Sequence, residues 1–273
     1  MRVISGKAIP RFLTGLVVFT MMCAGAAAAP AVKLKVGATP VPHAEILEVV
    51  KPMLSAKGIA LEIIEFTDYV TPNLALNDGD IDANFFQHVP YLESFAKDRR
   101  LAITYLAKVH IEPMGAYSRR VRSIKDLPVR AKIGIPNDPT NGGRALLLLQ
   151  KAGLITLNPK AGIDASVFDI TGNPKNLQIV ELDAAQLPRS LDDLDLAIIN
   201  SNFALEAKLV PARDALVIEA SDSPYANVLA VRNSNKTNAA LRELAQALTS
   251  KEVADFIVKK YKGSVVPAFE LNF

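Results

Sequence analysis

The chain has 273 residues, of which 31 are Lys or Arg, 28 are Asp or Glu and one is Cys. Half of the residues are hydrophobic and 6% are aromatic, which excludes a disordered tail, a collagen and a disulfide-rich mini-protein. The length suffices for one large domain or for two lobes, each with its own core.

The first 28 residues have the pattern of a secretory signal peptide. Arg2, Lys7 and Arg11 are the only charged residues before position 33. An apolar stretch and an alanine-rich stretch follow them, and a basic start, an apolar middle and a small-residue end are typical of exported proteins. We expect cleavage after Ala28, with an uncleaved membrane-spanning segment as the alternative.

Cys23 raises a second alternative, because bacterial lipoproteins carry their lipid on a cysteine at the end of the signal peptide. The cysteine of such a site normally follows a small residue and has Leu three positions before it. Met22 and Thr20 occupy these positions here, so the sequence favours a soluble exported product over lipidation at Cys23. In either case we expect a periplasmic location.

Removal of the signal peptide changes the charge balance. Subtracting its three basic residues leaves 28 Lys or Arg, which equals the number of Asp and Glu. The processed chain is formally neutral, so its charge gives no reason to expect a nucleic-acid partner. It also lacks cysteine, which excludes structural disulfides, thiolate catalysis and zinc bound by cysteine.

The remainder of the chain alternates between predicted strands and predicted helices. In the first part we expect strands at 33–38, 61–66, 81–86 and 101–109, and helices at 43–57, from 71 and at 89–99. In the second part we expect strands at 131–135, 177–182, 194–199, 215–219 and 228–231, a helix at 141–151 and two helices within 236–260. Strands separated by helices indicate α/β layers.

Short motifs of common enzymes and metal sites are missing from the sequence. It has no nucleophile elbow, Gly-rich phosphate loop or paired-His zinc motif, so neither an enzyme nor a cofactor is expected. The acidic stretch 78–82 lacks the mid-loop Gly and the distal Glu of a calcium loop. His43, His88 and His110 lie far apart in sequence, so no metal site is expected. A metal-binding protein that gathers these three histidines is the alternative from a different functional class.

Polar and aromatic side chains gather where predicted strands meet loops. The segments are 68–73 together with 83–88, then 135–144, 199–204 and 223–227. In open α/β sheets, ligands bind at such strand ends. The turn and capping preferences of Asn explain each segment alone, but the four together favour one shared polar cleft.

A loop with two prolines at 136–140 leads into a helix that we expect to start near Asn141. The free N–H groups of its first turn and the positive end of the helix dipole would favour an anion. Arg144 lies in the same turn, where the dipole disfavours a cation. A ligand carboxylate would compensate by accepting a bidentate pair of bonds from the guanidinium. The alternative is a structural ion pair with an acid such as Asp138.

Longer runs of the sequence resemble a known family. These runs are DYVTPNLAL, GDIDANFFQHVPYL, HIEPMGAYS, IPNDPTNGGRALLLLQKAGLI, NPKNLQIVELDAAQLPRSLDDLDLAIINSNFA and DSPYANVLAV. They are similar to the NlpA-type methionine-binding lipoproteins, the substrate-binding components of methionine ABC importers, and the resemblance covers essentially all of 34–269. It implies an α/β fold of the periplasmic binding-protein type (type II), in which two lobes enclose a hinged ligand cleft.

The resemblance also implies a domain division, a ligand and a partner. Lobe 1 would comprise 29–117 and 230–273, and lobe 2 would comprise 118–229, so that the chain crosses between the lobes twice. The ligand would be L-methionine or a close analogue, with another amino acid, a methionine derivative or a dipeptide as the alternative. The partner would be the permease of an ABC importer.

The family's ligand pocket carries over onto seven positions of this chain. Three match the wall around the thioether side chain, two match groups that hold the α-carboxylate, and two match amides that orient the head group. In that order they are Tyr69, Phe86 and His88; Asn141 and Arg144; and Asn202 and Asn227. The resemblance gives no definite role to His110 and Glu112. The run Asn200-Ser201-Asn202 departs from the Asn-Thr-Thr of other members.

Overall fold

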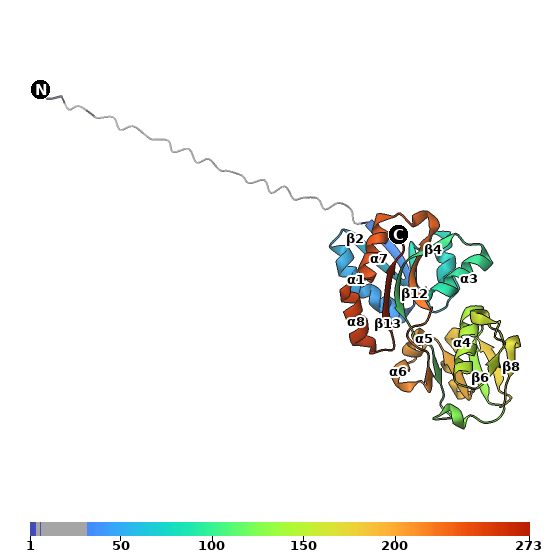
Figure 1. Ribbon diagram of the computed structural model, residues 1–273. Helices are drawn as coiled ribbons and strands as arrows, with labels where there is room; N and C mark the ends of the chain where they lie inside the picture. Colours follow the sequence, from blue (N-terminus) through green and yellow to red (C-terminus); the bar gives the residue numbers. More distant parts are fainter. Residues whose placement is uncertain (4–5, 7–31) are drawn as a thin grey trace. The chain divides into compact units, whose positions relative to one another are not determined.

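The computed structural model describes residues 1–3, 6 and 32–273 (Figure 1). The expected signal peptide at 1–28, its cleavage after Ala28 and the alternative lipidation at Cys23 lie outside these residues, apart from positions 1–3 and 6. Within the described ranges, no helix has both the length and the apolar character that a membrane crossing requires.

Within residues 32–273, six strands form a first sheet in the order β13-β4-β12-β3-β1-β2. Their bounds are β1 Val32–Ala38, β2 Ile59–Glu65, β3 Ala83–His88, β4 Ile103–Ile111, β12 Ala226–Arg232 and β13 Val266–Leu271. β1 pairs in parallel with β2 and β3, whereas β12 runs antiparallel between β3 and β4. The sheet therefore combines strands from both ends of the described chain.

Helices cover both faces of this sheet. Their bounds are α1 Glu45–Ser55, α2 Thr71–Asp78, α3 Val89–Arg99, α7 Ala239–Leu248 and α8 Lys251–Tyr261. α1, α7 and α8 lie together beside the sheet (Figure 1) and bury Leu47 and Leu244 in one core with Leu229 of β12. Val228, the preceding residue, packs with Leu92 of α3 in a second cluster. Successive residues of β12 thus serve opposite faces of the sheet.

A second sheet has the order β11-β5-β10-β6-β9. Its strands are β5 Gly115–Tyr117, β6 Lys132–Pro136, β9 Gln178–Leu182, β10 Leu196–Ile199 and β11 Val217–Ile218; β7 Thr156–Leu157 and β8 Ile170–Gly172 form a separate pair. The helices of this part are α4 Pro139–Lys151, α5 Ser201–Glu206 and α6 Pro211–Asp214. α4 buries Leu146 and Leu149 against Ile133 and Ile198 of the sheet, which fixes the start of α4 at the end of β6.

The chain passes between the two sheets twice, at 112–114 and at 219–225. β5 already belongs to the second sheet, and β12 already belongs to the first. Both changes of sheet therefore occur a few residues before the expected lobe boundaries at 117/118 and 229/230. The division into two lobes stays a prediction.

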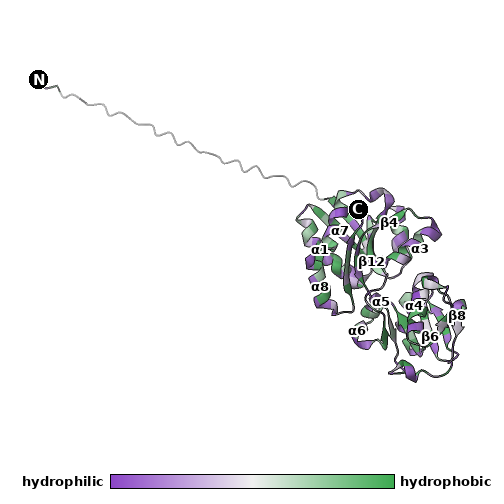
Figure 2. Ribbon diagram, in the orientation of Figure 1, coloured by the Kyte–Doolittle hydropathy of each residue, from purple (hydrophilic) through white to green (hydrophobic). Residues whose placement is uncertain are grey.

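The alternation of strands and helices is confirmed, as is the division of 236–260 into two helices. Ser250 separates α7 from α8, and its hydroxyl oxygen accepts a hydrogen bond from the N–H of Val253 at 3.4 Å. Figure 2 shows apolar residues along β4 and β12, between helices that carry polar residues outward. The sequence pattern did not indicate β5 or β13, because β5 is very short and β13 is a partly exposed edge strand that contains Pro267.

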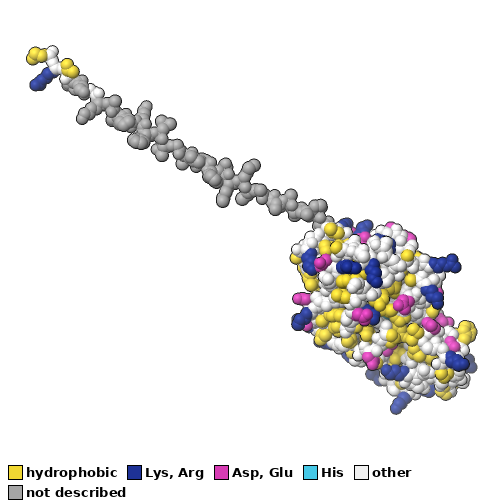
Figure 3. Space-filling model, turned by 45° about the horizontal axis from the view of Figure 1, so that its top comes forward, with side chains coloured by type: hydrophobic (Ala, Val, Ile, Leu, Met, Phe, Trp, Pro, Cys, Tyr) yellow, Lys and Arg dark blue, Asp and Glu magenta, His cyan; other side chains and the backbone are white. Residues whose placement is uncertain are grey.

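Charged side chains of both signs are interspersed on the face that Figure 3 shows. Several form exposed ion pairs, such as Lys33 with Glu62 at 2.6 Å and Lys108 with Glu270 at 2.8 Å. Such pairs contribute little to stability. Their mixture of signs is what a formally neutral processed chain would present.

Candidate functional site

A cavity lies at the strand ends and loops of both sheets. Its empty space is about 330 Å³, which includes space open to solvent. The lining residues are Tyr69, Phe86, Gln87, His88, Tyr91, Glu112, Asn141, Arg144, Asn200, Ser201, Asn202 and Asn227. All seven positions carried over from the family resemblance are among them. The structure thus brings these side chains together, while the ligand contact of each stays a prediction.

Aromatic rings form one wall of the cavity. The ring centroid of Tyr69 lies 5.9 Å from that of Phe86, 5.8 Å from that of Tyr91 and 4.9 Å from that of Phe203. The hydroxyl of Tyr91 donates to the main-chain oxygen of Tyr69 at 2.8 Å, which fixes the two rings relative to each other. Such rings offer an apolar, polarizable surface that suits an aliphatic or thioether side chain.

Three buried amides hold this wall in place. Asn73 Nδ2 donates to Gln87 Oε1 at 2.7 Å, and Gln87 Nε2 donates back to Asn73 Oδ1 at 2.7 Å. Asn84 Nδ2 also donates to Asn73 Oδ1, at 2.9 Å. The network ties α2 to β3, so these amides of the 68–73 and 83–88 segments are explained by the scaffold.

The start of α4 differs from the expected anion site. The helix begins at Pro139, and the carboxylate of Asp138 caps it by accepting the N–H of Asn141 at 2.9 Å. Asp138 also accepts hydrogen bonds from Nδ2 of Asn141 and from the hydroxyl of Thr140. The protein's own carboxylate therefore occupies the position at which a ligand anion was expected.

Asn141 orients the polar groups next to it. Because its Nδ2 donates to Asp138, its Oδ1 is the acceptor for His88 Nε2 at 3.0 Å and for Asn200 Nδ2 at 2.8 Å. Nδ1 of His88 accepts a backbone N–H at 3.1 Å, so the proton of the neutral ring lies on Nε2. Burial lowers the pKa of His88 to about 3. Asn200 is left with Oδ1 as a buried acceptor that has no partner.

Asn202 of α5 and Asn227 of β12 both line the cavity. Asn202 Oδ1 accepts the hydroxyl of Tyr69 at 2.5 Å, and its buried Nδ2 has no partner. Asn227 Oδ1 accepts a hydrogen bond from His43 Nε2 at 3.1 Å. Unpaired buried polar atoms cost free energy. The free donor of Asn202 and the free acceptor of Asn200 therefore point to a ligand that both accepts and donates hydrogen bonds.

Arg144 is buried and paired within the protein. Its Nε and Nη2 donate to the carboxylate of Glu219, with Nε 3.1 Å from Oε1, and Nη2 also donates to the main-chain oxygen of Glu112 at 2.7 Å. The guanidinium carbon lies 4.1 Å from the ring centroid of Tyr225. Glu219 thus takes the bidentate pair that was expected for a ligand, and Asp138 is not the structural partner. Among the described residues, Nη1 makes none of the hydrogen bonds of this side chain.

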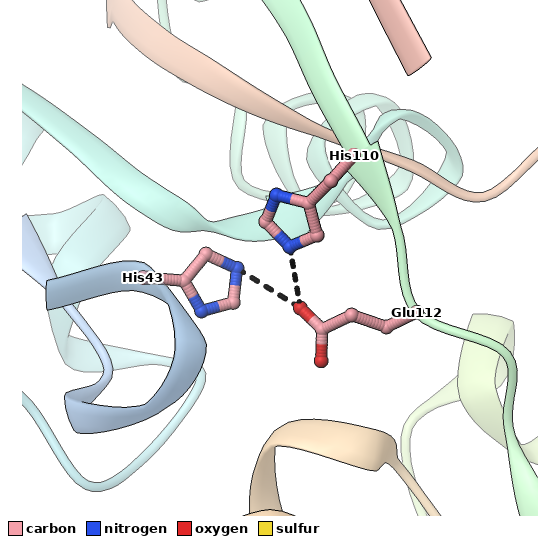
Figure 4. Close-up of side chains that lie close together, drawn as sticks. All are labelled: His43, His110 and Glu112. Atoms are coloured by element: carbon pink, nitrogen blue, oxygen red, sulfur yellow. Dashed lines mark hydrogen bonds and ion pairs between the residues drawn. The ribbon is translucent and has the colours of Figure 1, made fainter. Parts of the chain in front are cut away.

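His43, His110 and Glu112 form a buried cluster that borders the cavity (Figure 4). Nε2 of His110 lies 2.8 Å, and Nε2 of His43 lies 3.2 Å, from the same oxygen of Glu112. Burial lowers the pKa of His43 to about 4 and that of His110 to about 3, and it raises the pKa of Glu112. The three groups are close enough to share a metal ion. His88 is hydrogen-bonded to Asn141 and does not belong to this cluster, so the three histidines do not form one metal-binding group.

Sequence reasoning did not select the other lining residues, which are Gln87, Tyr91, Glu112, Asn200 and Ser201. Gln87, Asn200 and Ser201 lie in the polar segments at strand ends, whereas Tyr91 and Glu112 lie outside these segments. The pattern alone could not distinguish Tyr91 and Asn200 from ordinary helix and capping residues.

Comparisons with known proteins agree with this architecture. A family model described as NlpA lipoprotein matches residues 34–269. The D-methionine-binding lipoprotein MetQ of Escherichia coli is 42% identical over 236 residues, which cover 85% of this chain and 87% of that protein.

Solved structures also resemble this fold. A nutrient-binding protein from Burkholderia cenocepacia, bound to methionine, has 49% identity and a TM-score of 0.84, and the match covers 86% of this chain and 100% of that one. Lipoprotein Tp32 from Treponema pallidum has 40% identity and a TM-score of 0.83, over 86% of this chain and 99% of that one. The expected α/β fold of the periplasmic binding-protein type is confirmed.

Proposed function

Since the chain belongs to the NlpA lipoprotein family, we propose that it is the methionine-binding component of an ABC importer and, as expected, not an enzyme. The methionine-bound structure from Burkholderia cenocepacia carries this proposal, because it is 49% identical to this chain and is matched over its whole length. The cavity supports it, because an aromatic wall and unpaired polar atoms lie side by side there.

The ligand's two ends fit different parts of the cavity. The thioether packs against Tyr69, Phe86 and the neutral ring of His88, where each sulfur–aromatic contact contributes about 0.3–1.5 kcal/mol. The carboxylate takes Nη1 of Arg144 and Nδ2 of Asn202, the donors that the protein leaves unused. Asn141 acts indirectly, because both of its Nδ2 hydrogens go to Asp138.

Calorimetry with L-methionine tests the proposal. The protein is first unfolded and refolded to remove any ligand carried through purification. We expect saturable binding at micromolar concentrations or below, with norleucine weaker and alanine undetectable. Absence of binding for both enantiomers of methionine would contradict the proposal. Tighter binding of a dipeptide or of a methionine derivative would identify that compound, in place of methionine, as the ligand.

We also propose that the protein is exported to the periplasm and delivers its ligand to a membrane permease. The lipoprotein names of its relatives favour a location outside the cytoplasm. Mass spectrometry of the N-terminal peptide distinguishes the two forms: a soluble product beginning at Ala29, or a membrane-bound product with lipid on Cys23.

A further inference from the structure

His43 is a buried side chain that lies behind the cavity wall. It belongs to the turn between β1 and α1, is 1% exposed and is not one of the residues that line the cavity. Its ring meets that of Phe85 edge-on, with the centroids 4.7 Å apart, and its centroid lies 5.0 Å from that of His110. Because this packing restricts the ring, it also fixes the groups that the two ring nitrogens face.

The contacts of the ring show which of its nitrogens carries the proton. Nε2 lies 3.2 Å from Oε1 of Glu112, and a carboxylate can only accept a hydrogen bond. Nδ1 lies 2.7 Å from the buried hydroxyl of Thr39, which can donate to it. Burial lowers the pKa of His43 to about 4, so the neutral ring has a single N–H. These contacts place that N–H at Nε2.

The N–H at Nε2 determines how the amide of Asn227 is turned. The backbone of Asn227 is held in β12 between His88 of β3 and His110 of β4. Its side-chain amide could still be turned over, because the oxygen and nitrogen ends have nearly the same shape. Oδ1 of Asn227 accepts the hydrogen bond from Nε2 of His43 at 3.1 Å. The opposite orientation would bring two donors against each other.

The donor end of this amide is the part that remains for the cavity. Asn227 lines the cavity, and among the described residues its Nδ2 donates no hydrogen bond. Nδ2 of Asn202, in the same wall, is also without a partner. Two amide donors in one wall suit a carboxylate, which only accepts hydrogen bonds. If Asn227 were turned over, one of them would be replaced by an oxygen that repels this group.

A metal ion shared by His43, His110 and Glu112 is the other explanation for this cluster, and two observations speak against it. Nε2 of His110 lies 2.8 Å from Oε1 of Glu112, which is a hydrogen-bond distance, whereas ligands of a tetrahedral zinc ion are about 3.3 Å apart. A metal-bound histidine nearly always donates its other N–H to a neighbour. Among the described residues, the buried Nδ1 of His110 has no partner.

We propose that His43 is a positioning residue: held by Thr39, it keeps the amide of Asn227 turned with Nδ2 toward the carboxylate of the ligand. This inference rests on the proposed function and adds to it a residue that acts on binding without touching the ligand. It requires that the affinity depend on the donor at His43 only while Asn227 carries its amide.

Two substitutions that separate the ring nitrogens of His43 test the proposal. The amide of Gln can occupy the place of Nε2 and donate to Asn227, whereas the shorter Asn reaches only the place of Nδ1. Both variants, His43→Gln and His43→Asn, are made with Asn227 intact and again with Asn227→Ala, and calorimetry measures the affinity for L-methionine. With Asn227 intact, we expect His43→Asn to bind about tenfold more weakly than His43→Gln. With Asn227→Ala, the two should agree within about twofold.

An equal ratio in both backgrounds would overturn the inference, because His43 would then act through Glu112 or through the scaffold. Equal affinities of the two variants with Asn227 intact would overturn it as well. So would methionine binding that is lost on EDTA treatment and restored by zinc, because His43 would then be a metal ligand.

A second pair of variants serves if those at His43 do not unfold cooperatively. Thr39→Ser keeps the hydroxyl that faces Nδ1, and Thr39→Val removes it. We expect Thr39→Val to bind methionine about threefold more weakly than Thr39→Ser, and only with Asn227 intact. Thr249→Val is the matched control, because the hydroxyl of Thr249 donates to the main-chain oxygen of Ala245, away from the cavity. An effect of Thr39→Val that persists in Asn227→Ala would contradict the inference.

Nitrogen NMR of protein with labelled histidines tests the orientation without any ligand. We expect His43, identified by the signals that disappear in His43→Gln, to carry its proton on Nε2 near neutral pH. A proton on Nδ1 would refute the inference, because Asn227 would then turn its oxygen to the cavity. Failure of the refolded wild type to bind methionine would instead refute the proposed function, so the two failures are distinguishable.

Discussion

Two groups of the protein hold Arg144 before any ligand arrives, the carboxylate of Glu219 and the main-chain oxygen of Glu112. A guanidinium fixed in this way loses little conformational entropy when it binds a carboxylate, so it is preorganised for that task. The same arrangement makes Arg144 a structural residue, because Glu219 is largely buried and relies on it for charge compensation.

Arg144→Ala should therefore reduce both binding and stability. We expect methionine affinity to fall by about 2–5 kcal/mol, and the free energy of unfolding to fall by about 3 kcal/mol because a buried acid loses its partner. Calorimetry and denaturant unfolding measure the two effects separately.

The double variant Arg144→Ala/Glu219→Gln separates the two roles. It should recover much of the lost stability, since the unpaired charge is gone, while methionine binding stays weak. If binding recovered together with stability, Arg144 would have no direct part in holding the ligand.

At the scale of single residues, the sequence predicts which side chains line the cavity. It predicts less well which hydrogen bonds and ion pairs these side chains form. Tyr69, Phe86 and Asn202 were placed by long family-like runs, and they do line one cavity. The partner of Arg144 is 75 positions away, and no local pattern links the two. The same holds for Asn200, whose bond to Asn141 depends on how β10 and α4 are packed.

The start of α4 depends on two glycines that allow close packing. A Cβ at Gly143 would lie 2.5 Å from the main-chain oxygen of Ile163 and 2.9 Å from that of Ala165, and a Cβ at Gly142 would lie 2.9 Å from the oxygen of Pro136. These neighbours are backbone atoms, which cannot rotate away. The glycines therefore set the position of the turn that carries the site residues of α4.

Gly143→Ala should displace this turn. The clash should outweigh the gain in helix propensity and reduce the free energy of unfolding by about 1–2 kcal/mol, with a loss of methionine affinity of about tenfold. Thermal unfolding and calorimetry give the two numbers. Gly153→Ala, beyond the other end of α4, has a φ of 72° and no atom near the added methyl, so it should reduce stability and leave affinity unchanged.

At the scale of helices and strands, hydrophobic periodicity predicted the elements that have a long apolar face. α4 was placed within two residues of its start, and α3 was placed at its observed bounds. β5, β7 and β8 have two or three residues each, which is too short to show any period. Their pairing is decided by neighbouring strands rather than by their own sequence.

The molecule as a whole buries three histidines in neutral form. Burial lowers the pKa of His43 to about 4, and that of His88 and His110 to about 3, from an unfolded value of 6.5. Below pH 6.5 the histidines of the unfolded chain bind protons, whereas the buried histidines of the folded chain stay neutral. The stability from these groups is complete above pH 6.5 and is lost progressively as the pH falls towards 4.

We therefore expect the temperature at the midpoint of thermal unfolding to decrease as the pH is lowered from 7.5 to 5. Each proton contributes about 1.4 kcal/mol per pH unit, and the raised pKa values of Glu112 and Asp138 oppose part of this effect. His88→Gln should flatten the slope by about one proton. A midpoint independent of pH over this range would contradict the neutral assignment.

Arg144 also links the two segments in which the chain passes between its sheets, since Glu112 begins one and Glu219 begins the other. Any rotation of one sheet against the other must turn about these segments, so its axis runs close to the guanidinium. Displacement grows with distance from an axis. A ligand head group bound at Arg144 would therefore keep its contacts through such a rotation, whereas groups that lie farther from the axis would change theirs.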